Sequence, residues 1–244
     1  MAFPQTQYDC DNQPWRRRAQ WRVARAAETA NVTAVARGRF ITFEGGEGGG
    51  KSTQARRLAE RLDGAGVRVV VTREPGGSPG AEAIRALFVT GAADRWSAIS
   101  ETLLVYAARR DHIERVIRPA LDRGDWVVCD RFADSTRAYQ GSAGGAPMSL
   151  IAALEASVLE DVRPDLTLVL DVPVELGLAR AASRAEGEAR FEAKGAPFHE
   201  RLRAAFLDIA RAAPDRCVVI DASLPMARAE IEVWAAVSDR LGVP

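Results

Sequence analysis

The chain has 244 residues, enough for one α/β domain with a short appendage. Its 33 Lys and Arg residues balance its 33 Asp and Glu residues, so no overall positive field draws it to nucleic acid or to an anionic membrane. No apolar run approaches the roughly 18 residues that a membrane-spanning helix requires. The sequence therefore argues against nucleic-acid and membrane partners, and any recognition of phosphate must come from a local cluster of charge.

The first 38 residues differ from the rest, because they are rich in Arg and Ala and poor in acidic residues. Such a composition is typical of an amphipathic targeting or surface-binding helix. It also fits a disordered or weakly helical leader. We favour the leader, because the first motif that indicates a function begins at Phe40. The three cysteines have neither a metal-ligand nor a CxxC spacing, and the N-terminus lacks a secretory apolar region. We therefore expect a cytoplasmic protein whose folded domain spans residues 39–244.

Beyond residue 38, short apolar runs alternate with helical patterns. The apolar runs are β-branched and continuous, as in strands buried on both faces, at residues 39–44, 67–72, 126–130, 166–172 and 216–221. The helical patterns lie at residues 51–63, 81–88, 98–123, 148–160, 173–184, 199–212 and 226–241. This alternation predicts a three-layer α/β/α fold with a five-stranded parallel sheet. A charged, glycine-containing segment at about residues 183–197 is typical of a mobile lid.

The stretch from Gly45 to Ser52 reads GGEGGGKS and matches the phosphate-loop pattern GxxxxGK[ST] between a predicted strand and a predicted helix. Glycines let successive backbone N–H groups converge on phosphate oxygens, and the helix start adds its positive dipole end. The pattern predicts an ATP site with Lys51 on the β- and γ-phosphates and the Ser52 hydroxyl on Mg²⁺. The expected ATP-binding residues are Gly45, Gly46, Glu47, Gly48, Gly49, Gly50, Lys51, Ser52 and Thr53.

A second metal ligand is expected where a strand ends. Asp130 ends the run WVVCD, in the arrangement by which Walker-B carboxylates act on Mg²⁺. Asp171 ends another predicted strand and is the rival for this role. We favour Asp130, because the neighbouring Arg131 can bind a second anion, and we interpret Asp171 as a cap at its strand end.

Three further motifs lie next to predicted strand ends, where open α/β sheets bind ligands. They read TREPGG at residues 72–77, YAARRDH at 106–112 and DSTRAYQG at 134–141. Together with FITFEGGEGGGKST, VVCDRF and RPDLTLVLDVP, they make the sequence resemble the thymidylate kinases from about Phe40 to Leu241. The resemblance implies a P-loop fold of the nucleoside monophosphate kinase type, which transfers the γ-phosphoryl group of ATP to dTMP with Mg²⁺ and works as a homodimer.

The resemblance also implies roles for individual residues on the acceptor side. Arg131 corresponds to the arginine that binds the dTMP phosphate, and Arg109 to the arginine that contacts the thymine edge. Glu47 is expected near the sugar 3′-hydroxyl and the metal. The other substrate-binding residues that the resemblance implies are Arg73, Pro75, Thr136, Tyr139 and Gln140.

Three positions depart from patterns found in the family. Phe132 replaces a tyrosine, and Val105 replaces an aromatic residue that stacks on thymine in some members, which makes the neighbouring Tyr106 a candidate base platform. Gly48 stands where some members carry an arginine.

Members without that arginine supply cations from the lid. The resemblance therefore implies that Arg190 and Arg184 are catalytic, alongside Lys51 and Glu47. Arg180 is expected on the helix before the lid, facing either nucleotide or solvent.

Two other functions stay open. A P-loop kinase for another nucleoside monophosphate would share the phosphate loop but lack the pairing of TREPGG with AYQG. An ATP-driven switch would hydrolyse ATP in response to a macromolecule and would transfer no phosphate to a small acceptor. The acceptor-side arginines and the lid-like segment argue against the switch.

Overall fold

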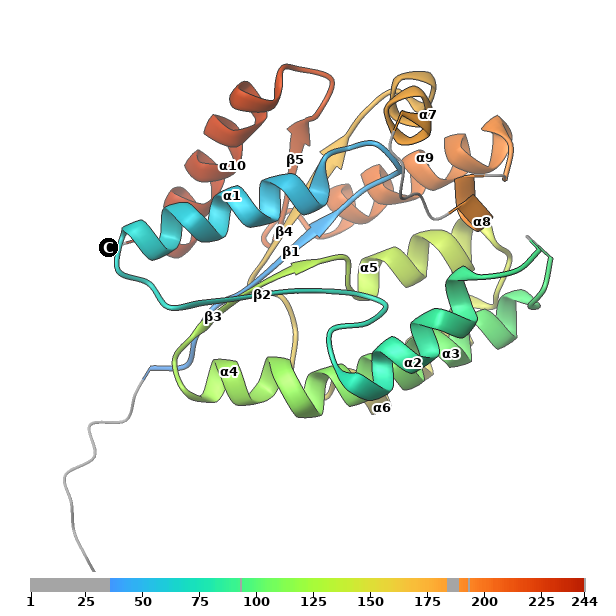
Figure 1. The fold of residues 1–244 in the computed structure, drawn as a ribbon, viewed down its shortest axis with the longest axis horizontal. Coiled ribbons are helices and arrows are strands. Elements are labelled where there is room, and N and C mark those ends of the chain that lie inside the picture. Colours follow the sequence, from blue (N-terminus) through green and yellow to red (C-terminus); the bar gives the residue numbers. More distant parts are fainter. Residues whose placement is uncertain (1–35, 93, 184–188, 193, 244) are drawn as a thin grey trace, which may run out of the picture. The chain divides into compact units, whose positions relative to one another are not determined.

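A computed structural model describes residues 36–92, 94–183, 189–192 and 194–243. Its strands form one parallel sheet in the order β2-β3-β1-β4-β5 (Figure 1). They are β1 (Phe40–Glu44), β2 (Val69–Arg73), β3 (Trp126–Asp130), β4 (Leu166–Asp171) and β5 (Cys217–Asp221). The predicted five-stranded parallel sheet is confirmed, and each strand overlaps its predicted range.

Strand β1 is buried along its whole length because it lies between β3 and β4 with both faces covered. Ile41 and Phe43 pack toward α1 (Lys51–Gly64) and α10 (Met226–Leu241). Phe40 points to the opposite layer. The buried hydroxyls of Thr42 and Thr167 share a hydrogen bond of 3.0 Å, so neither is left without a partner in the core.

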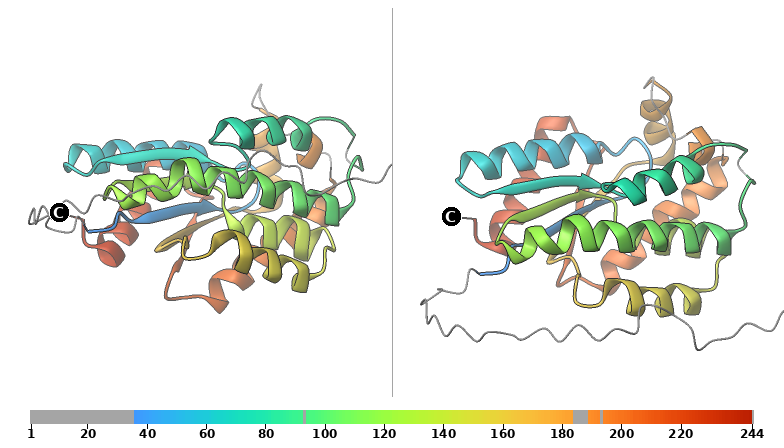
Figure 2. Two further views of the ribbon diagram at one scale, coloured as in Figure 1. Left: turned by 90° about the horizontal axis from the view of Figure 1, so that it is seen from below. Right: turned by 60° about the horizontal axis from the view of Figure 1, so that its bottom comes forward.

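The opposite face of the sheet is covered by a long helical run and by two further helices (Figure 1). The run consists of α3 (Ala98–His112), the π-helical segment η1 (Ile113–Ile117) and α4 (Arg118–Asp122). The other two are α6 (Met148–Leu159) and α9 (Ala196–Ala212). Figure 2 shows α2 (Pro79–Val89) alongside α3, against which it packs.

The predicted helix at 98–123 is present, but it contains a wide turn. The N–H of Arg118 donates to the carbonyl of Ile113, five residues earlier. Pro119 follows directly and has no N–H to donate, so an α-helical ladder cannot continue unbroken through this point.

Four helical elements differ from the sequence predictions. Helix α5 (Ala133–Thr136) and the π-helical segment η2 (Arg137–Ala143) follow β3 where no helix was predicted, because this run is short, polar and contains Gly141. Helix α8 (Ala189–Glu192) lies within the predicted lid. Helix α9 begins three residues before the predicted 199, with a proline in its first turn.

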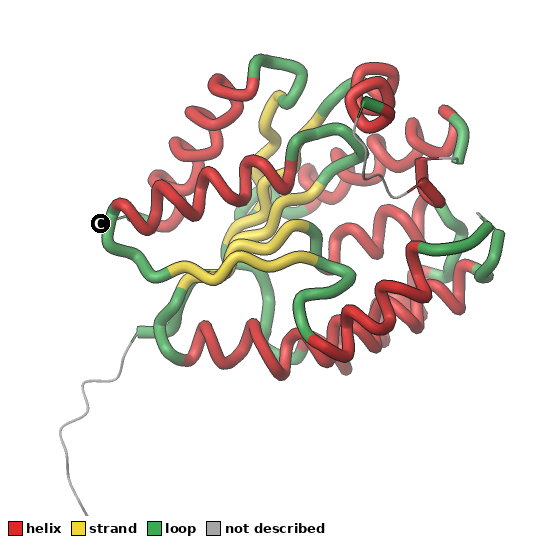
Figure 3. Tube along the Cα trace, viewed as in Figure 1, coloured by secondary structure: helices red, strands yellow, loops and turns green. Residues whose placement is uncertain are grey.

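Because all the strands are parallel, their carboxyl ends and the loops that follow lie along one edge of the sheet (Figure 3). Helix α7 (Val174–Ala182) follows β4 at this edge. The predicted leader lies outside the described residues apart from 36–38, and the predicted lid is described only in part. In the described part of the chain, no helix is both long and apolar enough to cross a membrane.

Candidate active site

The phosphate loop joins the end of β1 to the start of α1 and is shaped by glycines. Gly48 and Gly50 have φ values of 70° and 84°, which side-chain-bearing residues rarely adopt. A Cβ atom on Gly48 would lie 2.0 Å from the carbonyl oxygen of Gly177 in α7. The position at which some relatives carry an arginine is therefore closed to any side chain in this structure.

Lys51 lies folded over this loop. Its Nζ donates a hydrogen bond of 2.6 Å to the carbonyl oxygen of Gly46, and the residue is buried. Burial, and then the nearby positive charge of Arg131, lower the pKa of Lys51 to about 8, although Glu47 and Asp130 pull in the other direction. The ammonium group thus lies where its charge is poorly solvated and an incoming phosphate would compensate it.

Ser52, in the first turn of α1, contacts Asp130 at the end of β3. The Ser52 hydroxyl donates to Asp130 Oδ2 at 2.5 Å, and Asp130 Oδ1 is buried with no hydrogen-bond partner among the described residues. A hydroxyl and an unsatisfied carboxylate oxygen are hard ligands that suit Mg²⁺, which takes one or two protein oxygens and completes its shell with water and phosphate. This pair fits the predicted metal site.

Asp171 is placed differently from Asp130. Both of its carboxylate oxygens accept hydrogen bonds from Arg203 in α9, at 2.7 and 2.9 Å. This bidentate pairing satisfies the carboxylate, which agrees with a structural role at the end of β4.

Arg131 connects the phosphate loop to the neighbouring cavity. Its Nη1 donates to the carbonyl oxygen of Gly45 at 2.9 Å, and its Nη2 donates to Glu47 Oε1 at 3.1 Å. The φ of Arg131 is 72°, an uncommon conformation for a non-glycine residue, and its backbone N–H donates to the carbonyl oxygen of Phe43 at 2.9 Å. The strained backbone aims the guanidinium at the boundary between the loop and the cavity.

Glu47 is held by two acceptor-side residues. The same Oε1 that binds Arg131 accepts the hydroxyl of Tyr139 at 2.5 Å. Burial would raise the pKa of Glu47, but the positive charges of Arg131 and Lys51 and the hydrogen bond from Tyr139 together lower it to about 2. The carboxylate therefore stays ionised at neutral pH.

A cavity of about 360 Å³, its open mouth included, lies beside Arg131. Most of its lining is aromatic or apolar, with a few polar groups between, as in pockets that hold a planar base. The predicted acceptor residues that line it are Pro75, Arg109, Arg131, Thr136, Tyr139 and Gln140. Phe88 and Phe191 also line it, and the sequence alone does not point to either residue. Phe88 lies in an apolar run like any core residue, and Phe191 is a single Phe in a charged segment, so no sequence signal marks either one as part of a cavity.

Arg109 is the most tightly fixed cation of this cavity. Its Nε donates to Glu74 at 2.7 Å, and its Nη2 donates to the carbonyl oxygen of Phe132 and the hydroxyl of Thr136, both at 3.0 Å. Glu74 in turn contacts His112 Nδ1 at 3.0 Å. Arg109 Nη1 is buried and has no partner among the described residues. The Arg109 guanidinium is thus held in one orientation, and its Nη1 group can still donate a hydrogen bond to a ligand.

Two predicted acceptor residues lie away from the cavity lining. Val105 and Arg109 line it one helical turn apart, so Tyr106 projects from a different face of α3. Its ring packs in the core instead, 4.8 Å from the Arg109 guanidinium carbon, and burial raises its pKa. Arg73 is exposed and pairs with Glu82 at 3.1 Å. Tyr106 supports Arg109 from behind rather than forming a platform in this cavity.

The lid arginines were predicted to face the phosphates. The side chain of Arg190 is buried and pairs with Glu101, and its Nε and Nη1 donate to the carbonyl oxygens of Ala92 and Phe88, both at 3.1 Å. These contacts place Arg190 behind the aromatic wall of the acceptor cavity. Arg184 lies outside the described residues, so its role stays a prediction.

A second cavity, of about 490 Å³, lies on the other side of the phosphate loop, beside Gly48 and Gly49. Arg180 lines it, and its guanidinium donates to the carbonyl oxygens of Ala222 and Ser223 at 2.6 and 3.2 Å. Arg180 is therefore anchored to the segment that follows β5, beside the phosphate loop.

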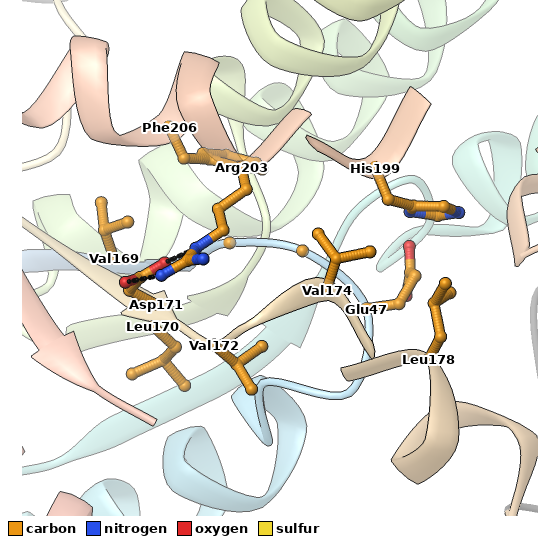
Figure 4. A pocket seen from close by; sticks show the side chains of 12 residues that line it. Glu47, Val169, Leu170, Asp171, Val172, Val174, Leu178, His199, Arg203 and Phe206 are labelled. Carbon is orange, nitrogen blue, oxygen red and sulfur yellow. Dashed lines mark hydrogen bonds and ion pairs between the residues drawn. The ribbon is translucent and has the colours of Figure 1, made fainter. Parts of the chain in front are cut away.

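A third cavity lies beneath the phosphate loop, against α9 (Figure 4). Figure 4 shows the Glu47 carboxylate pointing toward the ring of His199, while Arg203 pairs with Asp171 deeper in. His199 is buried, and its Nε2 has no hydrogen-bond partner among the described residues. This arrangement brings a further polar side chain close to Glu47.

Comparison with known proteins agrees with this geometry. The sequence model of the family described as "Thymidylate kinase" matches residues 43–233. A thymidylate kinase of Caulobacter vibrioides is 67% identical over 214 residues, which cover 86% of this chain and 100% of that protein. A thymidylate kinase of Nitrobacter hamburgensis is 56% identical over 216 residues, covering 88% of this chain and 94% of that protein.

A solved structure gives the same result. The crystal structure of thymidylate kinase from Ehrlichia chaffeensis superposes with a TM-score of 0.67 at 38% sequence identity, covering 82% of this chain and 98% of that one. With a family match over most of its length and relatives well above 30% identity, this chain belongs to the thymidylate kinase family.

Proposed function

We propose that this protein transfers the γ-phosphoryl group of ATP to the phosphate of dTMP, giving dTDP and ADP. The observation that carries the proposal is the position of Arg131, which binds both Gly45 and Glu47 of the phosphate loop and also lines the acceptor cavity. One cation thus lies between the phosphate loop and the acceptor cavity, the two sites between which the phosphoryl group must pass. An ATPase switch has no need for such a connection to a base-sized cavity.

Recognition of the acceptor base is supported by Arg109 and Gln140. Arg109 Nη1, which has no partner among the described residues, offers a donor to a carbonyl oxygen of thymine. Gln140 lines the same cavity and has a carboxamide that can accept or donate. Phe88 and Phe191 supply flat apolar surface around them, and their ring centroids lie 5.3 Å apart.

On the donor side, backbone N–H groups of Gly45 to Gly50 and the start of α1 suit the ATP phosphates. Lys51 suits the β- and γ-phosphates, and the cavity beside Arg180 suits the adenine. Ser52 and Asp130 would hold Mg²⁺, which neutralises charge on the bridging phosphate oxygens.

The chain's own residues then act by positioning and by charge. Phosphoryl transfer spreads negative charge over equatorial oxygens, so fixed cations on both sides of the moving group lower its barrier. Lys51 supplies this charge from the donor side and Arg131 from the acceptor side. Glu47, ionised and fixed by Arg131 and Tyr139, is suited to accept a hydrogen bond from the acceptor's sugar hydroxyl.

We also infer a cytoplasmic homodimer with a folded domain at residues 39–244 and a leader at 1–38 that the reaction does not require. Exposed apolar side chains on the adjacent helices α2 and α3 support a homodimer: Leu87, Ile99 and Leu103 are 46%, 47% and 49% exposed. Light scattering on the purified chain tests the dimer. Activity of a chain that lacks residues 1–37 tests the leader.

The activity is tested by ADP release with ATP and Mg²⁺ against a panel of dTMP, dUMP, dCMP and dGMP. The proposal expects dTMP to have the highest kcat/KM. A different best acceptor would contradict the assignment to dTMP, and ADP release independent of any acceptor would favour an ATPase.

A further inference from the structure

One buried ion pair outside the phosphate loop has no role in the proposed transfer. It joins Arg190 of α8 to Glu101 of α3, and the two side chains are 0% and 5% exposed. Taking two charges out of water is costly, and a buried pair is retained only where its geometry is closely matched. The surroundings of this pair show what it positions.

Arg190 holds the aromatic wall of the acceptor cavity. It donates through Nη1 to the carbonyl oxygen of Phe88, and its guanidinium carbon lies 5.8 and 5.3 Å from the ring centroids of Phe88 and Phe191. Both rings line the cavity. The guanidinium therefore fixes the wall from behind, where the cavity's occupant would not touch it.

Glu101 divides its two carboxylate oxygens between two partners. Oε1 accepts from Arg190, and Oε2 accepts from the side-chain amide of Gln140 at 3.1 Å. Gln140 comes from η2, far from Glu101 in sequence, and is itself 3% exposed. A single carboxylate thus connects α8, α3 and the segment that carries an acceptor residue.

The chemistry of this contact decides which way the Gln140 carboxamide faces. An ionised carboxylate can only accept hydrogen bonds, so the amide NH₂ of Gln140 must be the group directed at Glu101. The carbonyl oxygen of Gln140 is then left for the cavity that the residue lines. Without the negative charge of Glu101, both orientations of the carboxamide would become available.

We propose that the Arg190–Glu101 pair is a positioning unit for acceptor specificity, which fixes the Gln140 carbonyl oxygen as a hydrogen-bond acceptor for the ring N–H of the base. The inference rests on the proposed dTMP kinase function. Thymine presents a ring N–H between two carbonyl oxygens. An oriented Gln140 carbonyl together with the spare Arg109 N–H complements that edge. Cytosine presents a ring nitrogen acceptor and an amino group, so the same pair disfavours it.

The variant Glu101→Gln tests this with little change of shape. Its new carboxamide can give its carbonyl to Arg190 and its NH₂ to Gln140, which turns the Gln140 carboxamide around. We expect kcat/KM for dTMP to fall at least about fivefold, mainly through KM, as expected when a buried hydrogen bond is mismatched. The ratio of kcat/KM for dTMP to that for dCMP should fall with it, while the KM for ATP stays the same.

Substitutions of Arg190 separate positioning from catalysis. Arg190→Met should raise the KM for dTMP and lower the dTMP to dCMP ratio, and Arg190→Lys should recover part of both, because it retains the charge but not the fork. A fall in kcat of orders of magnitude at unchanged dTMP KM would overturn the proposal, since it would make Arg190 a transition-state contact. Thermal unfolding of each variant reports its fold, and Glu101→Gln carries the test if Arg190→Met does not fold.

Glu155→Gln provides a matched control. Glu155 is also a buried carboxylate, 6% exposed in its side chain, and pairs with Arg137, but it does not line the acceptor cavity. The Glu155→Gln variant should leave the ratio of kcat/KM for dTMP to that for dCMP at the wild-type value. The proposal is contradicted if Glu101→Gln also leaves this ratio unchanged, or if Glu155→Gln lowers it equally. A wild-type protein that does not prefer dTMP would instead contradict the proposed function.

Discussion

The ATP-binding (donor) half and the acceptor half of the candidate site are formed by different kinds of group. The donor half is mostly backbone: glycines shape a loop whose N–H groups and helix start suit phosphate, and Lys51 adds one buried positive charge. The acceptor half is mostly side chain, and its cations are each fixed by carboxylates, carbonyls or hydroxyls from other segments. The donor half can therefore suit any nucleoside triphosphate, whereas the acceptor half can distinguish one base from another.

This difference predicts different responses to substitution. Removing a donor-side group should damage the transfer itself, because phosphate contacts strengthen as charge develops. Changing an acceptor-side group should mainly alter the affinity and selectivity for dTMP.

Lys51→Ala is expected to have the largest effect. It removes the only side-chain cation of the loop, and loss of one preorganised charge-stabilising group costs about a hundredfold to a thousandfold in kcat. Steady-state kinetics with dTMP as acceptor measures this, and an unchanged thermal unfolding midpoint shows that the fold is intact. Retention of most of the activity would refute the phosphate-bridging role of Lys51.

Gly48→Ala is expected to come next, with about a hundredfold loss of kcat/KM for ATP. A left-handed conformation costs a side-chain-bearing residue about 1–2 kcal/mol, and the new Cβ atom would lie 2.0 Å from the Gly177 carbonyl oxygen, so the loop must move. Gly46→Ala serves as the comparison, because a Cβ atom there has no neighbour within 4 Å in the part of the chain that the structure describes. Equal losses in both variants would show that the contact with α7 does not shape the loop.

Arg109→Lys should affect the acceptor half alone. The lysine retains the charge but cannot reproduce the fork that binds Glu74, Phe132 and Thr136 while presenting a spare N–H. We expect the KM for dTMP to rise about tenfold, with little change in the KM for ATP. A larger change in the KM for ATP than in the KM for dTMP would contradict the separation of the two halves.

Glu44→Gln should have the smallest effect on turnover, but it tests the contact between the strand before the phosphate loop and the residues that line the acceptor cavity. Glu44 ends β1 and accepts hydrogen bonds from the Phe132 N–H at 2.8 Å and the Ser135 hydroxyl at 2.5 Å. Burial, reinforced by the negative charge of Asp134, raises the pKa of Glu44 from 4.5 to about 7. Between pH 4.5 and 7 the folded protein retains a proton that the unfolded chain has released.

The contribution of Glu44 to stability is therefore present below pH 4.5 and is lost as the pH rises through 7. The loss amounts to at most about 3 kcal/mol. Chemical unfolding of wild type and Glu44→Gln at several pH values measures it. The free energy of unfolding of wild type relative to the variant should fall over this range, and a constant or rising difference would contradict the assignment.

The same contrast explains what could be predicted from sequence. The sheet, the phosphate loop and the Ser52–Asp130 pair follow from local patterns, and the sheet is confirmed. Arg109, Thr136 and Gln140 could be named only through a resemblance. The packing around them depends on contacts such as Glu101 with Gln140, 39 residues apart, which no local pattern encodes.

The placements that the sequence does not predict have the same cause. Tyr106 and Val105 are neighbours in sequence, but only Val105 lines the cavity, because the rotation of α3 is set by packing against the sheet and α6. The sequence predicts Arg190 to be a lid cation, whereas the structure places it behind Phe88 and Phe191, because its partners Phe88 and Glu101 come from segments far from it in the chain. Sequence reasoning identified the residue types but not the direction in which they point.

Phosphorus NMR of the protein with ATP, Mg²⁺ and dTMP tests the central claim most directly, because it identifies the product that receives the γ-phosphoryl group. The resonances of dTDP should grow at the rate at which the γ-phosphate of ATP disappears, with no matching release of inorganic phosphate. Inorganic phosphate in place of dTDP would show that the cavity beside Arg131 does not hold the acceptor of this reaction.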